Sequence, residues 1–167
     1  MEYIMMHNYI FFVHFICYWI MVFLLDKNIQ KKKQHNVAVL SSLKNQIIYT
    51  YPAIYLFFEY YPINYDDILH STMTIPLLGT CSDIYFYLSH RPMHTKLLYK
   101  YHKHHHTGEV CVAKALDADG IEHIIGNLGS FISGILLLWY FGFIINIYIY
   151  FVCQIKIVRL KIHQLLY

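Results

Sequence analysis

Charged side chains are scarce in this sequence. They make up 14% of its 167 residues, whereas a soluble domain of this size would carry about a quarter. Hydrophobic residues account for 57% of the chain and fall in long runs rather than being spread evenly. This pattern excludes an ordinary soluble domain. It predicts an all-α fold, a polytopic bundle of membrane helices.

Cysteine is also sparse, and its four copies are far apart: Cys17, Cys81, Cys111 and Cys153. They form no C-x-x-C pair, and Cys17 and Cys81 fall inside predicted membrane spans, so neither a disulfide framework nor a zinc ribbon is indicated. The formal net charge of +3 is modest. Because the lysines cluster beside apolar runs, they indicate membrane topology, and no nucleic-acid partner is expected.

The apolar runs predict a topology. Residues 3–25 are long enough to cross a bilayer core about 30 Å thick, and they lack both a preceding basic segment and a following cleavage site, which predicts an uncleaved anchor. A lysine-rich polar loop at 26–44 is expected in the cytosol. A shorter span at 47–61 contains Pro52, and a third span at 68–88 returns to the cytosolic side.

The last apolar region, residues 128–153, is long for one span and short for two. Its basic tail favours a tight helical hairpin broken near Gly142, while a single span with a lumenal tail stays open. Gly126, Ser130 and Gly134 repeat at four-residue intervals, a stripe of small residues that predicts close helix packing in lipid.

The strongest chemical signal is a histidine-dense stretch at residues 83–106, DIYFYLSHRPMHTKLLYKYHKHHH. Five of its histidines fall at helical spacings in two groups: His90 and His94, then His102, His105 and His106. Residues three and four apart share a helix face, and imidazole is the commonest protein ligand for iron, zinc and copper. Two such faces predict a metal site with too many ligands for one tetrahedral zinc. A fortuitous histidine-rich tract would have no reason to keep these spacings.

Three further residues of this stretch bear on the site. Pro92 disfavours helical geometry at the residue before it, so the helix is expected to kink there or to end near His90. Asp83 lies on the helix face of the first histidine pair and is a candidate additional ligand or supporting acid. His104 falls on the opposite side of its turn and is expected outside the site.

At this point the sequence resembles a known family. The pattern H-R-x-x-H, a short linker containing Leu-Tyr, then H-K-x-H-H is similar to the fatty acid hydroxylase superfamily, which includes C-4 methylsterol oxidases, sterol C-5 desaturases and sphingoid or fatty acyl hydroxylases. These are membrane-embedded, histidine-ligated diiron enzymes. The resemblance therefore implies a two-iron site in a histidine-rich helical cap on the cytosolic side of the membrane. His90, His94, His102, His105 and His106 would be iron ligands and would make up about half of the ligands that such a site needs.

Residues 112–123, VAKALDADGIEH, extend the resemblance. They look like a family segment that usually reads A-x-x-A-H-P-x-E-H, with Asp119-Gly120 in place of His-Pro. Asp119 could replace an imidazole as a carboxylate ligand or have no role. Glu122 and His123 are candidate ligands or supporting groups, and an interfacial polar pair without a role in the site is equally open.

The resemblance implies an oxidoreductase that uses O2 and iron to hydroxylate or desaturate a C–H bond of a lipid. The lipid could be a sterol, a sphingoid base or a fatty acyl chain, with a slight preference for the sterol and sphingolipid branches. Electrons would come from NAD(P)H through a reductase and cytochrome b5. The implied location is the endoplasmic reticulum membrane, in a multi-pass topology with the histidine boxes facing the cytosol.

The resemblance covers residues 45–151. Family members continue with a further H-x-x-H-H box, whereas this sequence ends in QIKIVRLKIHQLLY and offers only His163. The predicted organisation is an anchor with a basic loop (1–44), an incomplete hydroxylase-like membrane domain (45–153) and a basic tail (154–167). The alternative function is therefore a truncated or inactive family member acting as a non-enzymatic membrane protein. A metal transporter fits less well, because transporter ligands usually lie within the spans.

Overall fold

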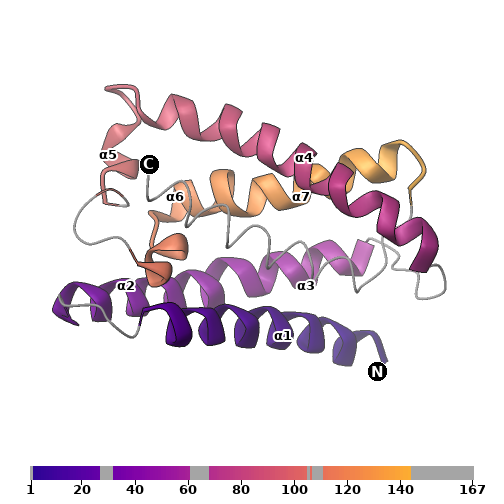
Figure 1. Ribbon diagram of the computed structural model, residues 1–167, viewed down its shortest axis with the longest axis horizontal. Helices are drawn as coiled ribbons and strands as arrows, with labels where there is room; N and C mark the ends of the chain where they lie inside the picture. The colour runs from indigo at the N-terminus through magenta and orange to yellow at the C-terminus, as the bar shows by residue number, and fades with distance from the viewer. Residues whose placement is uncertain (1, 27–31, 61–67, 105, 107–110, 144–167) are drawn as a thin grey trace.

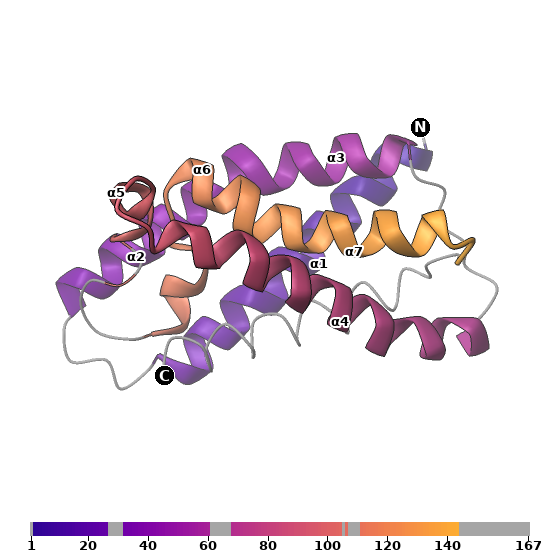
Figure 2. The ribbon, with the colours of Figure 1, turned by 90° about the horizontal axis from the view of Figure 1, so that it is seen from above.

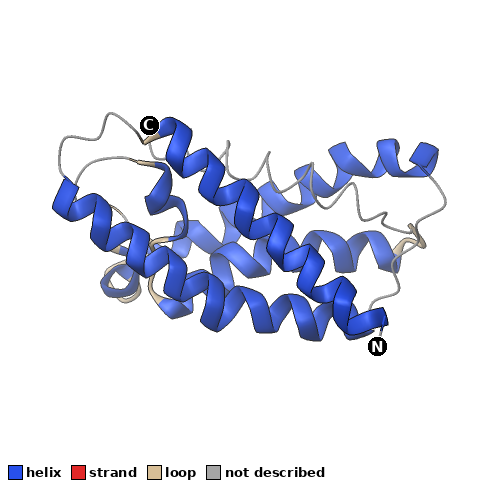
Figure 3. Cartoon of the chain, turned by 90° about the horizontal axis from the view of Figure 1, so that it is seen from below, coloured by secondary structure: helices blue, strands red, loops and turns tan. Residues whose placement is uncertain are grey.

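The computed structural model describes residues 2–26, 32–60, 68–104, 106 and 111–143. Throughout this part of the chain all regular structure is helical and no strand occurs (Figure 3), so the predicted all-α fold is confirmed. Several predictions lie outside the described residues: those for His105, Cys153, His163, the tail at 154–167 and the second half of the hairpin.

The described elements form a bundle of long, roughly antiparallel helical rods (Figures 1 and 2). The rods are built from α1 (Glu2–Leu25), the continuous series α2 (Lys32–Asn45), η1 (Gln46–Thr50) and α3 (Tyr51–Tyr60), then α4 (Ile68–Met93), and last the series α6 (Gly120–Glu122), η3 (His123–Leu128) and α7 (Gly129–Tyr140). The short helices α5 (Tyr99–His102) and η2 (Val112–Leu116) lie at one end of the bundle, where α1 and α4 finish and where α2 and α6 begin.

Two helical stretches are long and apolar enough to cross a membrane: Asn8–Leu25 in α1 and Gly120–Tyr140 in the last rod. This judgement rests on length and composition within the described residues. The predicted spans at 47–61 and 68–88 fall mostly in helices, but neither meets the same criterion. Polar residues such as Thr74, Ser82 and Asp83 interrupt the apolar positions of α4.

The polar stretch at 26–44 was predicted to be a loop, and that prediction is wrong, because α2 begins at Lys32. Ala38, Ser42 and Asn45 are its buried residues, and their spacing of four and three places them on one helix face. Helices are usually recognised by an apolar stripe. Here the buried stripe is small and polar, so hydropathy does not register it.

The small-residue stripe packs against α4, as its spacing predicts. A Cβ atom added at Gly134 would lie 2.7 Å from Leu78 Cδ1 and 2.8 Å from Ser82 Oγ. Around this close approach, α4 and α7 share an apolar core that includes Leu78, Ile135 and Leu138. α7 then ends at Tyr140, and Gly142 adopts a positive φ of 78°, which confirms the predicted break near this residue.

The Asp26 carboxylate, directly after α1, binds two backbone groups of a distant segment. It accepts hydrogen bonds from the N–H groups of Val112, at 2.7 Å, and Ala113, at 2.9 Å. Asp26 is buried, and His35 Nε2 lies 3.2 Å from its second oxygen. Charge-assisted bonds of this kind are about twice as strong as neutral ones. Asp26 therefore fixes the start of η2 against the end of α1.

Side chains of α1 and α2 satisfy the carbonyl groups of the same buried segment. The Tyr18 hydroxyl donates to the Ala113 carbonyl at 2.9 Å. The remaining bonds run from Ser42 Oγ to the Ala113 carbonyl at 2.5 Å and from Asn45 Nδ2 to the carbonyls of Leu116, at 2.7 Å, and Ala118, at 2.9 Å. Buried backbone groups need such partners, so residues 111–118 owe their position to α1 and α2.

We expect Asp26→Asn to destabilise the protein, because an amide offers one acceptor oxygen where the carboxylate offers two. One buried N–H group would lose its partner, at a cost of about 2 kcal/mol. This corresponds to a fall in Tm of about 4–8 °C for a chain of this size, measurable by circular dichroism in detergent. The control is Glu59→Gln, a change at an exposed acid of α3. Equal shifts in the two variants would contradict the role of Asp26.

An alanine substitution should have different effects at two glycines of the stripe. In Gly134→Ala the new Cβ atom must push Leu78 and Ser82 away, which should lower the unfolding free energy by about 1 kcal/mol or more. Gly126→Ala should be neutral or stabilising, since the nearest atoms to its Cβ would be 4.0 Å away and alanine favours helix. Thermal unfolding of both variants tests this, and a Gly134→Ala chain as stable as the wild type would refute it.

Candidate metal centre

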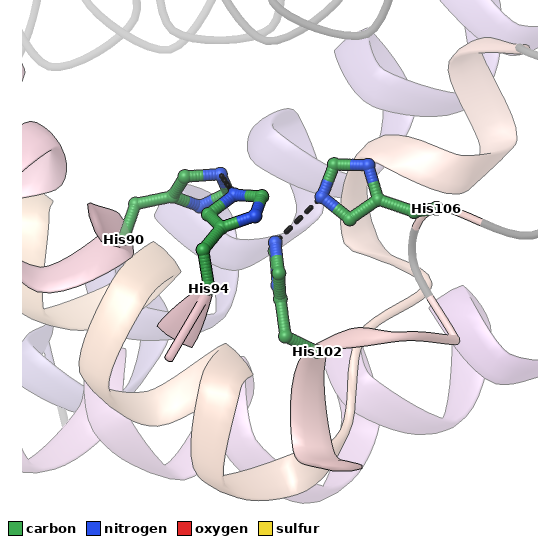
Figure 4. Close-up of side chains that lie close together, drawn as sticks. All are labelled: His90, His94, His102 and His106. Carbon is green, nitrogen blue, oxygen red and sulfur yellow. Dashed lines mark hydrogen bonds between the residues drawn. The ribbon is translucent and has the colours of Figure 1, made fainter. Parts of the chain in front are cut away.

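Four histidines converge at the end of the bundle (Figure 4): His90, His94, His102 and His106. One ring nitrogen from each lies within 4.8 Å of those of the other three. Imidazole nitrogens bound about 2.1 Å from one metal ion lie roughly 3–4 Å apart. The group therefore has the dimensions of a site for a metal ion, with an all-nitrogen donor set.

The end of α4 positions the first pair. α4 continues through Pro92 to Met93, so of the two predicted alternatives, a kink at Pro92 or a helix end near His90, the end near His90 does not occur. Pro92 has no N–H to donate to the Leu88 carbonyl, and the helix ends one residue later. The four-residue spacing is thus retained, and the Nε2 atoms of His90 and His94 lie 3.3 Å apart. Phe86, one turn earlier, stacks on the His90 ring with centroids 4.9 Å apart.

The turn after α4 positions the second pair. Backbone hydrogen bonds from Tyr99 N–H to the Thr95 carbonyl and from Lys103 N–H to the Tyr99 carbonyl, both 2.8 Å, keep this turn helical. His102 is completely buried, and its Nε2 atom lies 2.6 Å from His106 Nε2. The two rings therefore face each other across the space where the first pair also points.

Glu122 orients His102 from the opposite side. Its Oε1 atom lies 2.7 Å from His102 Nδ1, and both side chains are buried. Since a carboxylate only accepts hydrogen bonds, Nδ1 carries the proton, and Nε2 presents its lone pair toward the other histidines. This arrangement is the usual support of a metal-bound histidine, and it raises the basicity of the ligand.

The electrostatic surroundings of His106 favour its neutral form. Burial lowers the pKa of its imidazole below the ordinary value of 6.5, and His102, His94 and Lys114 lower it further. Only the neutral ring can bind a metal ion. The local field therefore keeps His106 in its metal-binding form.

The structure thus brings together four of the five predicted histidine ligands, while His105 lies outside the described residues. Of the two alternatives left open for Glu122, the geometry favours the supporting role, because its carboxylate lies beside His102. His104 stays apart, as predicted, with its Nε2 atom 3.1 Å from Asp117 Oδ1.

The other candidates are not part of the four-histidine group. Asp83 is exposed on α4. Asp119 is exposed as well, and its carboxylate caps α6 by accepting a hydrogen bond from Ile121 N–H at 3.0 Å. His123 is completely buried, but its ring nitrogens lie 3.0 Å from Thr50 Oγ1 and 3.1 Å from Asn127 Nδ2.

No role at the site was predicted for Phe86 from the sequence. Its stacking on His90 was predictable, because Phe86 lies one helical turn before His90. Thr50 and Asp117 contact His123 and His104, which lie outside the four-histidine group, and no local pattern marks either contact.

An apolar groove lies between the α3 rod and the last rod. It consists of two cavities of about 480 and 590 Å³, whose linings share Ala53, Leu56, Ile132 and Leu136. One cavity extends toward Trp139 at the end of α7, and the other toward Tyr49 and Ile124, near the start of η3. Its lining suits an apolar ligand.

No family model, curated protein or solved structure matches this chain. The candidate site is therefore defined by its own geometry.

We expect Glu122→Gln to weaken metal binding by about tenfold or more, because it removes the negative charge that supports His102. Titration of the detergent-purified chain with Fe²⁺ or Zn²⁺ against a competing chelator measures this change. Asp83→Asn is the control: it also neutralises a carboxylate but lies outside the four-histidine group. Unchanged affinity in Glu122→Gln would show that Glu122 contributes only to folding.

Proposed function

We propose that this chain is a membrane-bound, iron-dependent oxidoreductase that uses O2 to hydroxylate or desaturate a C–H bond of a lipid. One observation carries the proposal: four imidazoles from two helical segments converge, and a buried carboxylate fixes one of them. The resemblance of residues 83–106 to the fatty acid hydroxylase superfamily supplies the reaction class.

The residues present fit iron. Imidazole is a suitable ligand for iron, zinc, copper and nickel, and the described nitrogens supply the ligands of one ion. A second iron would draw on His105 and on residues outside the described part of the chain. When bound, iron would supply the activation of O2; hydroxylation also consumes two electrons and two protons and yields water beside the alcohol. The protein orients the ligands, and His102 is screened from solvent.

Lipid as the substrate class is supported by two features of the fold. Two stretches have the length and composition of membrane spans, and the apolar groove lies along one of them. An acyl chain, sphingoid base or sterol could enter this groove from the bilayer. By family resemblance, we propose a multi-pass protein of the endoplasmic reticulum whose histidines face the cytosol and which receives electrons from NAD(P)H through a reductase and cytochrome b5.

A second candidate function is a non-enzymatic membrane protein of the same descent. The observation in its favour is the number of ligands, since the four described histidines suffice for one ion rather than two. Such a protein would bind metal without oxidising lipid.

Iron content and lipid oxidation together test these proposals. We expect one to two irons per chain in the detergent-purified protein, measured by mass spectrometry, and their loss in the double variant His102→Ala, His106→Ala. The matched control is His104→Ala, which removes an imidazole outside the group and should keep the iron. With O2 and a reductant, the wild-type chain should convert a lipid substrate to an oxidised product.

The outcomes separate the two candidates. Iron binding without product, across sterol, sphingoid and acyl substrates, would favour the non-enzymatic protein. Iron no higher in the wild type than in the double variant would refute both metal-dependent proposals.

A further inference from the structure

The turn that carries His102 has a second, outward face made of lysines. Backbone hydrogen bonds wind residues 95–103 into consecutive turns, of which Tyr99–His102 form the helix α5. Lys96, Lys100 and Lys103 follow one another at intervals of four and three, and a chain wound in this sense places residues at such intervals on the same side. All three lysines are exposed, whereas His102 is completely buried. One turn thus presents positive charge to the outside and a candidate metal ligand to the inside.

Among the residues that the structure describes, no acidic side chain forms an ion pair with these lysines. The sequence has no acidic residue between Asp83 and Glu109. The acidic residues that face this region from η2 and α6 are Asp117 and Glu122, and both are buried and paired with histidines. Lys100 Nζ lies 4.7 Å from the centroid of the Tyr101 ring. Because its three lysines carry positive charge, the face is complementary to a negatively charged partner.

A large apolar side chain accompanies these lysines. Leu97 follows Lys96 directly and is 77% exposed. Exposed leucine beside lysine is the composition of segments that rest in the headgroup region of a bilayer, with the apolar residue inserted and the cations at the phosphates.

The position of the turn fits that role. α5 lies at the end of the bundle where the candidate span Asn8–Leu25 finishes and where Gly120–Tyr140 begins (Figure 1). A membrane crossed by these two stretches would have one boundary at this end. We propose that residues 96–103 bind the anionic phospholipid headgroups of that boundary, through Lys96, Lys100 and Lys103, with Leu97 inserted beside them.

This inference rests on the membrane location in the proposed function but not on its chemistry. The test uses the full chain in a neutral detergent and measures its affinity for phosphatidylglycerol and phosphatidylcholine by thermophoresis. The wild type should prefer phosphatidylglycerol. Replacing all three lysines by glutamine should lower that affinity on the order of a hundredfold, because each surface lysine contributes about 1 kcal/mol. Added salt should reduce the preference.

Two control variants define the result. Replacing Lys32, Lys33 and Lys44 by glutamine removes the same charge from exposed positions of α2, which begins at the same end of the bundle, and should lower the affinity much less than the change at residues 96–103. Replacing Lys96, Lys100 and Lys103 by arginine keeps the charge and should retain binding. Equal losses in both glutamine variants would refute the proposal in favour of a general charge effect. No loss in either would also refute it, and would direct the search to an acidic protein partner. Neither result would alter the iron content that tests the proposed function.

Discussion

The buried backbone of residues 111–118 is the constraint on which the rest of the structure depends. Peptide groups removed from water must find hydrogen-bond partners. Some of these groups bond to one another within the segment, and others bond to side chains of α1 and α2 and to the Asp26 carboxylate directly after α1. This segment leads directly into α6. Fixing it therefore fixes Glu122, and with it the ring of His102. The support of the candidate metal centre thus begins at the end of the first helix.

The candidate centre combines contacts within one helical turn with a contact between residues far apart in the sequence. The spacing within each histidine pair is local, because a single helical turn aligns residues four apart. The carboxylate that orients His102 comes from a separate element, 20 residues further along the chain. Such a division makes metal affinity sensitive to the fold, since any shift of η2 moves Glu122 without touching a histidine. Conversely, a metal ion bound to all four imidazoles would hold α4 and the following turn together.

The sequence could reveal the features that depend on one segment, but not the contacts between segments far apart in the chain. The all-α fold, the histidine pairs, the stripe that brings Gly134 against α4 and the break at Gly142 were all predictable, because each depends on spacing within one segment. The hydrogen bonds of Asp26 were not, since they join residues 86 and 87 positions apart and no local pattern marks the pairing. The helix at Lys32–Asn45 was missed for another reason. Its buried face consists of Ala38, Ser42 and Asn45, and these small or polar side chains do not form the stripe of large apolar residues by which a helix is usually recognised.

The few charges of this chain are distributed unevenly inside the fold. Four of its charged residues are buried in the described structure, Asp26, Lys114, Asp117 and Glu122, and all lie at the end of the bundle that carries the histidines. Burying a charge is costly unless it is paired or hydrogen-bonded, and three of the four are paired with histidines. The apolar groove lies along the rods that lead away from this polar end. The fold thus separates its buried charges and histidines, at one end, from the apolar side chains that line the groove along the rods.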